Sequence, residues 1–204
     1  MARHEIPKRW AKARMATLDI EAVKEYAESM VENVEEGRGI ILTGPPGTGK
    51  SWGLAALTVA FQREAAKEAE RIPSKDYVYI TAPEFFDCIP VFGESEDTHR
   101  RKPYISTFTT IPWLVINDLG KEYRGGKLDE QIPMKLGRIL RKRCEDKLPT
   151  HISSNLDMDG IKATYGTSIV SVLRETCSAY HVGGEDRRFK QQPLRAIPGG
   201  KKTA

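Results

Sequence analysis

Short apolar runs alternate along the chain with longer stretches of helical periodicity. Apolar, aromatic or β-branched stretches at 39–44, 76–81 and 113–118 predict three strands, and the stretches at 150–155 and 179–182 are taken as two more. Runs without polar alternation are typical of strands that are buried on both faces of a parallel sheet. The pattern predicts an α/β fold with a mainly parallel, five-stranded sheet flanked by helices.

Apolar positions three and four residues apart predict helices between these strands. One helix is expected from Asp19, as its N-cap, to Gly37, and two more at 51–71 and 129–146. Short helices are expected at 157–164 and 167–177, and another from residue 82 that Pro90 interrupts, before a polar loop at 93–103. The 129–146 pattern turns Ile132, Leu136, Ile139 and Leu140 inward and Arg138, Arg141, Lys142 and Arg143 outward.

Composition bounds the class of protein. The chain has 204 residues, of which 39% are hydrophobic and 29% charged, as expected for one soluble domain. We expect a basic N-terminal arm at 1–18, a core at 19–189 and a disordered basic tail at 190–204. No apolar run reaches the roughly 20 residues that span a bilayer, and no secretory signal is seen, which predicts a cytoplasmic protein without membrane contact.

Charge and cysteine content add little. The formal net charge of +4 favours a polyanionic partner only mildly. The cysteines Cys88, Cys144 and Cys177 are widely spaced and form no C-x-x-C pair. Buried or half-buried free thiols are therefore expected, and neither a disulfide framework nor a zinc site is.

Residues 44–51, "GPPGTGKS", match the phosphate-loop pattern G-x-x-x-x-G-K-[ST] between a predicted strand and a predicted helix. In that setting backbone N–H groups and the helix N-terminus attract phosphates. Lys50 would reach the β- and γ-phosphates of ATP, and the Ser51 hydroxyl would ligate Mg²⁺. The residues expected to contact the nucleotide here are Gly44, Pro45, Pro46, Gly47, Thr48, Gly49, Lys50, Ser51 and Trp52.

Polar residues end two later strands. "LVINDLG" carries Asn117 and Asp118, where nucleotide-hydrolysing enzymes place a metal-binding acid and a second acid that polarises water. Asn117 is uncharged, so its contribution to metal binding is expected to be weaker. Asp118 would act as the base or replace the missing metal carboxylate. Asn155 would hydrogen-bond the γ-phosphate or the attacking water; a turn-initiating role is its alternative.

Taken in order, these stretches resemble AAA+ ATPases, and among them the DnaC-type helicase loaders and IstB-type transposition helpers. The likeness covers roughly residues 5–190 and implies a P-loop fold with little or no separate lid domain. It is carried by "IPKRWAKARMATLD", "GRGIILTGPPGTGKSWGLAAL", "WLVINDLG", "LPTHISSNLD", "YGTSIVSVLRETC" and "GGEDRRF".

The resemblance implies roles for particular residues. Lys50 and Ser51 match the Walker A positions, Asp118 the catalytic carboxylate and Asn155 the sensor-1 position. Further along, Val172 stands where the family usually has its arginine finger, and Arg174 is a replacement candidate. Arg188, less certainly Arg187, matches the later arginine. Because such arginines often act across subunits, a ring or helical homo-oligomer is implied.

Partners follow from the same resemblance. It implies single- or double-stranded DNA in the oligomer's channel, and a replicative helicase, an initiator or a transposase as protein partner. Candidate DNA contacts are Arg100, Arg101 and Lys102, interleaved with Tyr104 on the predicted polar loop. A merely solvated loop is the alternative.

Three functions stay open at this stage. The first is a DNA-associated ATPase that acts as a loader or matchmaker. The second is a nucleotide-gated binding module with little or no hydrolysis, which Asn117 and Val172 favour. The third is a small-molecule P-loop kinase, which leaves the stretches "THISSN" and "SVLRE" unexplained.

Overall fold

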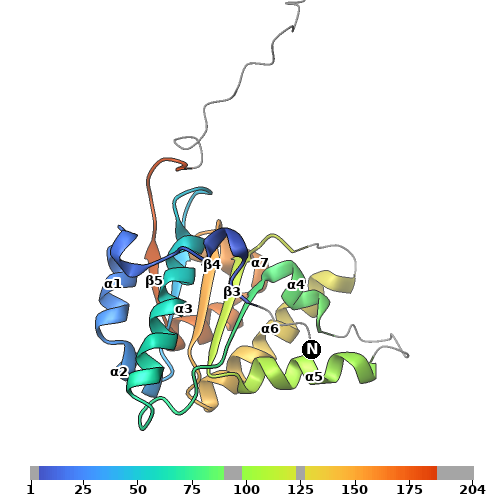
Figure 1. The fold of residues 1–204 in the computed structure, drawn as a ribbon. Coiled ribbons are helices and arrows are strands. Elements are labelled where there is room, and N and C mark those ends of the chain that lie inside the picture. Colours follow the sequence, from blue (N-terminus) through green and yellow to red (C-terminus); the bar gives the residue numbers. More distant parts are fainter. Residues whose placement is uncertain (1–4, 90–97, 123–126, 188–204) are drawn as a thin grey trace, which may run out of the picture.

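The protein is described by a computed structural model over residues 5–89, 98–122 and 127–187. Five parallel strands form one sheet in the order β2-β3-β4-β1-β5 (Figure 1). The strands are β1 (Gly39–Thr43), β2 (Tyr77–Thr81), β3 (Trp113–Leu119), β4 (Thr150–Ser154) and β5 (Cys177–His181). The predicted parallel α/β sheet is confirmed.

Helices cover both faces of the sheet. One group contains α1 (Glu21–Glu28), α2 (Met30–Glu35) and α3 (Lys50–Lys67). The other contains α4 (Ala82–Asp87), α5 (Thr98–Thr110), α6 (Lys127–Glu145), α7 (Met158–Tyr165) and α8 (Thr167–Thr176). Figure 1 shows the two groups on opposite sides of the strands.

Successive residues of β3 divide between the two resulting cores. Trp113 and Val115 are buried with the α1–α3 helices, whereas Leu114 and Ile116 are buried with the α4–α8 helices. This alternation follows from the pleat, which turns neighbouring side chains to opposite faces. Both faces are apolar because both are covered, which is why the strand sequence lacks polar alternation.

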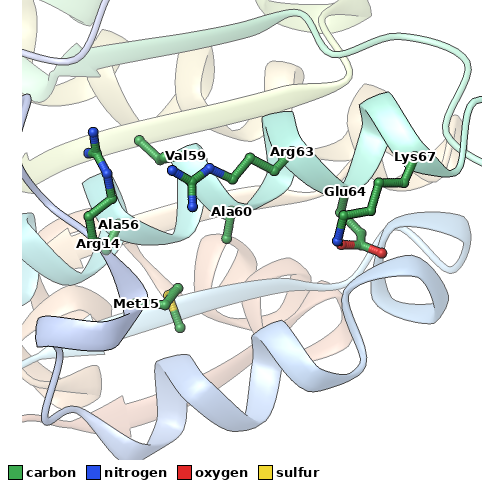
Figure 2. Close-up of a pocket in the computed structure, with 8 residues that line it drawn as sticks. All are labelled: Arg14, Met15, Ala56, Val59, Ala60, Arg63, Glu64 and Lys67. Atoms are coloured by element: carbon green, nitrogen blue, oxygen red, sulfur yellow. The ribbon is translucent and has the colours of Figure 1, made fainter.

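The N-terminal segment packs against the α1–α3 side. Two short 3₁₀ helices, η1 (Lys8–Trp10) and η2 (Met15–Thr17), precede α1, and Ala13 and Leu18 are buried there. Figure 2 shows a shallow hollow between η2 and α3. It is lined by Arg14, Met15, Ala56, Val59, Ala60, Arg63, Glu64 and Lys67, none of which belongs to the phosphate loop. In the described residues, no helix is both long and apolar enough to cross a membrane.

Two predicted boundaries were wrong. The helix expected from Asp19 to Gly37 is broken at Ser29 (φ −109°, ψ 33°) into α1 and α2, and its N-cap is Ile20. The polar loop expected at 93–103 is helical from residue 98 onward, as the start of α5, while 93–97 lie outside the described residues. Contacts of Phe108 with the core stabilise this helix, although its polar first half shows no helical pattern.

Arg143 was predicted to face outward from α6 but is only 1% exposed. Its guanidinium donates to the backbone oxygens of Phe108, Ile111 and Pro149 at 2.9, 2.8 and 2.6 Å, and to Thr150 Oγ1 at 2.8 Å. Burial lowers the pKa of Arg143 to about 9. The side chain thus fastens α5, α6 and β4 together. The three cysteines are half-buried free thiols, as expected.

His151 is fully buried on β4, and neither ring nitrogen has a hydrogen-bond partner among the residues that the structure describes. Its ring stacks on Trp113 with centroids 3.8 Å apart, and Tyr26 meets it edge-on. Desolvation, and then the nearby positive charge of Arg143, hold the pKa of His151 well below its ordinary value of 6.5. The folded protein therefore keeps this imidazole neutral.

His151 should make stability fall in mild acid. Below about pH 6.5 this histidine is protonated in the unfolded chain but stays neutral in the folded chain. The free energy of unfolding therefore decreases as pH falls. Between about pH 7.5 and pH 5.5 this contribution is about 1 kcal/mol. His151→Phe keeps the stacking and should remove that part of the pH dependence. Urea denaturation of both proteins at the two pH values measures it, and equal losses would contradict the assignment.

Candidate nucleotide site

The phosphate loop, residues 44–50, joins the carboxyl end of β1 to helix α3. Its backbone has positive φ at Gly44 (131°), Gly47 (81°) and Gly49 (99°). At Gly44 a side chain is also excluded by space, because an added Cβ would lie 2.4 Å from the backbone oxygen of Val182. The glycine spacing of the motif is therefore required by this turn.

Lys50 is the first residue of α3 and is only 4% exposed. Its ammonium donates to the backbone oxygens of Gly44 at 2.7 Å and Pro45 at 2.6 Å. Thr48, also buried, donates its hydroxyl to the oxygen of Pro45 at 3.0 Å. The loop is thus folded around its own lysine, which would exchange these carbonyls for phosphate oxygens.

Other members of the predicted contact set lie differently. Pro45 and Pro46 are exposed at the loop's outer side. Trp52 is partly buried and packs against the α1–α3 core. The indole is therefore part of the packing under the loop.

The parallel sheet brings the predicted strand-tip residues to the edge that carries the phosphate loop. Leu42 of β1 pairs in register with Ser153 of β4, and Thr81 of β2 pairs with Asn117 of β3. Tyr79 of β2 connects the phosphate loop with the end of β3. Its hydroxyl donates to the backbone oxygen of Ser51 at 2.9 Å and lies 3.4 Å from Asn117 Oδ1. Loop and strand tip are thereby connected through one buried phenol.

Asn117 is fully buried. Its Oδ1 accepts from the Ser153 hydroxyl at 2.8 Å, while its Nδ2 has no partner within the part of the chain that the structure describes. An amide whose oxygen is already bonded to Ser153 is a poor ligand for a divalent cation. The structure thus fits a weak metal role for this residue.

Asp118 has a left-handed backbone, with φ at 63°. Its N–H donates to Ser153 Oγ at 2.9 Å, and its carboxylate pairs with Lys121 at 3.1 Å. Such a conformation is uncommon outside glycine and often marks functional positions. Here it falls at an irregularity in the β3–β4 pairing, between Ile116 and Leu119, and the carboxylate remains partly exposed. Asn155 follows β4 at the same edge and is half-buried.

Mg²⁺ is usually held by one or two carboxylates together with substrate phosphates and waters. The residues at this edge fit that description through the Ser51 hydroxyl and the Asp118 carboxylate. In the described residues, no group of three histidine, cysteine, aspartate or glutamate side chains could hold a metal without the nucleotide.

The structure does not bring the arginine candidates to this site in the same way. Arg174 is exposed near the end of α8, three residues before Cys177, which pairs with Gly39 at the start of β1. Arg174 therefore lies near the amino ends of the strands, whereas Lys50 lies at their carboxyl ends. Arg187 lies beside the loop, and Arg188 falls outside the described residues.

The DNA candidates were predicted on a loop, and that placement was wrong. Arg100, Arg101 and Lys102 belong to the first turns of α5, and their side chains lie outside the described part of the structure. Tyr104 packs against the core, with its ring centroid 6.4 Å from that of Phe108. Stacking of Tyr104 on a base is therefore opposed by its packing.

Sequence reasoning missed two features of the site. Tyr79 was read only as a strand residue, and no sequence signal separates it from Tyr77 on the same strand. The segment after β5 crosses the phosphate loop. The sequence indicates only its arginines, and the role of its carboxylate at Asp186 is not visible there.

Solved structures with the same arrangement were found, although no protein-family model and no curated protein sequence matches the chain. A DnaI structure superposes with a TM-score of 0.63 at 23% identity, over 87% of this chain and 94% of that one. The DnaC helicase loader gives 0.66 at 22% identity, over 87% of this chain and 100% of that one. The chain has the AAA+ P-loop NTPase fold.

A replication initiator is also similar. DnaA bound to AMPPCP and single-stranded DNA superposes with a TM-score of 0.63 at 15% identity, over 88% of this chain and 53% of that one. These likenesses confirm the fold class predicted from the sequence. Beyond β5, the described residues 182–187 contain no helix.

Proposed function

We propose that this protein is a DNA-associated AAA+ ATPase that binds ATP with Mg²⁺, assembles on DNA, and acts as a helicase loader or as a matchmaker of the transposition type. The observation that carries the proposal is the hydrogen-bonded connection at the sheet edge, where Tyr79 links Ser51 of the phosphate loop to Asn117 of the strand tip. Similar folds in helicase loaders and in a DNA-bound initiator support the DNA part.

Each residue at this edge has a part in the proposed chemistry. Lys50 would neutralise the β- and γ-phosphates, and the Ser51 hydroxyl would hold Mg²⁺, which would supply charge neutralisation when bound. Asp118 would either complete the metal site or orient the attacking water, and Asn155 would hydrogen-bond the γ-phosphate or that water. The reaction is in-line attack of water on that phosphate, which yields ADP and phosphate.

A second candidate is a nucleotide-gated binding module with little hydrolysis. Asn117 favours it, because this buried residue brings no charge and its amide oxygen is already bonded to Ser153. In that case ATP would drive assembly on DNA and contact with a helicase, initiator or transposase without rapid turnover.

Steady-state phosphate release, measured with and without DNA, separates the two candidates. The ATPase proposal expects release above that of a Lys50→Ala control, with stimulation by DNA. Release equal to the control, while ATP still drives assembly, would establish the binding module instead.

Arg174 should act on the site of a neighbouring copy. Because it lies at the opposite edge of the sheet from its own Lys50, Arg174→Ala should leave ATP binding by the isolated subunit unchanged. Hydrolysis by the assembly should fall about a thousandfold or more, since arginine fingers contribute factors of that order. Lys162→Ala, an exposed cation on the neighbouring α7, is the matched control. Weaker ATP binding by the isolated Arg174→Ala subunit would contradict action across subunits.

A further inference from the structure

Residues 183–187, called the strap here, leave the end of β5 and lie across the phosphate loop. The chain is held before the strap by the Val182 N–H, which donates to the backbone oxygen of Thr43 at 2.7 Å. At its other end the Arg187 N–H donates to the backbone oxygen of Gly47 at 3.1 Å. The strap is therefore bonded both to the strand that enters the loop and to the loop itself.

Its side chains strengthen this position. Arg187 Nη1 pairs with Asp19 Oδ1 at 2.6 Å, which ties the strap to the residue preceding the N-cap of α1. The hydrogen bond and charge of Arg187 lower the pKa of Asp19, so both partners are charged at neutral pH. The pair is solvent-exposed, with side chains 45% and 64% accessible, and is consequently a weak and reversible fastening.

Asp186 places a carboxylate directly against the loop. A Cβ added at Gly47 would lie 1.9 Å from Asp186 Oδ1 and 2.5 Å from Oδ2, so the carboxylate occupies the space that a side chain at this glycine would need. The loop and the first turn of α3 carry the partial positive charge of a helix N-terminus and the full charge of Lys50. That field attracts a carboxylate for the same reason that it attracts phosphate.

We propose that the strap is autoinhibitory, with Asp186 lying on the phosphate loop until a nucleoside triphosphate displaces it. This inference rests on the proposed nucleotide binding. Phosphates and the carboxylate cannot share the loop, because both are negative and both require its surface. Nucleotide binding therefore releases the Arg187 bond to Gly47 and its pair with Asp19, which transmits occupancy of the site to the N-terminal segment.

Nucleotide affinity tests the strap directly. Asp186→Asn keeps the shape of the side chain and removes its charge, and it should tighten ATP binding about tenfold, as expected if the strap is closed in roughly nine-tenths of molecules. Asp19→Asn loosens only the exposed fastening and should tighten binding about twofold. The matched control is Glu28→Gln, which removes an exposed carboxylate outside the strap and should change nothing.

The outcomes separate the strap from the proposed function. If the wild type binds ATP and Asp186→Asn binds it with equal or lower affinity, the strap proposal is overturned and the nucleotide site stands. Binding by neither protein would overturn both proposals.

Amide hydrogen exchange provides a second readout in the wild type. Addition of a non-hydrolysable ATP analogue should speed exchange at the Arg187 N–H, because its bond to Gly47 is lost. Exchange at the Val182 N–H, bonded to Thr43 outside the strap, should stay the same. Unchanged or slower exchange at Arg187 with saturating analogue would contradict displacement.

Discussion

Replacement of Lys50 by alanine is expected to weaken ATP binding about a hundredfold. The ammonium is buried at the start of α3 and is held by the carbonyls of Gly44 and Pro45, where it faces the loop that would receive the phosphates. Loss of one partner from a desolvated charge pair costs about 2–5 kcal/mol, and about 2.7 kcal/mol corresponds to a factor of a hundred. Titration with a fluorescent ATP analogue measures the change.

Lys67→Ala is the matched control for this experiment. Lys67 ends the same helix, is exposed and pairs with Glu64. Its removal should leave the affinity within about twofold, since surface ion pairs contribute little. Equal affinities for Lys50→Ala and the wild type would show that the nucleotide does not use the phosphate loop.

Arg143→Met is expected to lower the free energy of unfolding by about 3–5 kcal/mol. The substitution removes the charged donor from the buried oxygens of Phe108 and Pro149, from the part-buried oxygen of Ile111, and from the Thr150 hydroxyl. Unsatisfied buried polar groups cost about 1–3 kcal/mol each, while relief from burying the guanidinium, visible in its pKa of about 9, offsets part of the loss.

Urea denaturation compares this variant with Arg138→Met, a matched change on the exposed face of α6. The control should shift the free energy of unfolding by less than about 0.5 kcal/mol. A similar small shift for Arg143→Met would mean that the guanidinium does not fasten α5 and β4 to α6.

Sequence patterns predicted β1 and β3 well because these two strands are covered on both faces. Their apolar runs stand out from the helical stretches between them. The phosphate loop was equally visible, since the turn at Gly44 and Gly47 admits no side chain without strain or collision. Local physical requirements of this kind appear in the sequence at fixed spacing.

Features that depend on distant contacts were not predictable in the same way. Arg143 reads as one cation among several on α6, and only the carbonyls of Phe108, Ile111 and Pro149 make it interior. Asp19 is a residue type that is common at helix N-caps, but its carboxylate pairs instead with Arg187, far along the chain. Local sequence does not indicate whether such a side chain bonds a distant residue or faces solvent.

The candidate site shows the same division. Lys50, Ser51, Asn117 and Asp118 could be assigned to one edge because parallel strands end there. The carboxylate of Asp186 could not be placed, since its position depends on the path of the chain after β5. The phosphate-release measurement tests whether Asn117 permits hydrolysis.

ATP-dependent assembly on DNA is the central claim, and sedimentation velocity with DNA and a non-hydrolysable ATP analogue tests it most directly. The wild type should form a ring or filament only when both ligands are present. Lys50→Ala should show no such assembly under the same conditions. A wild-type protein that sediments as a monomer with saturating analogue and DNA would contradict it.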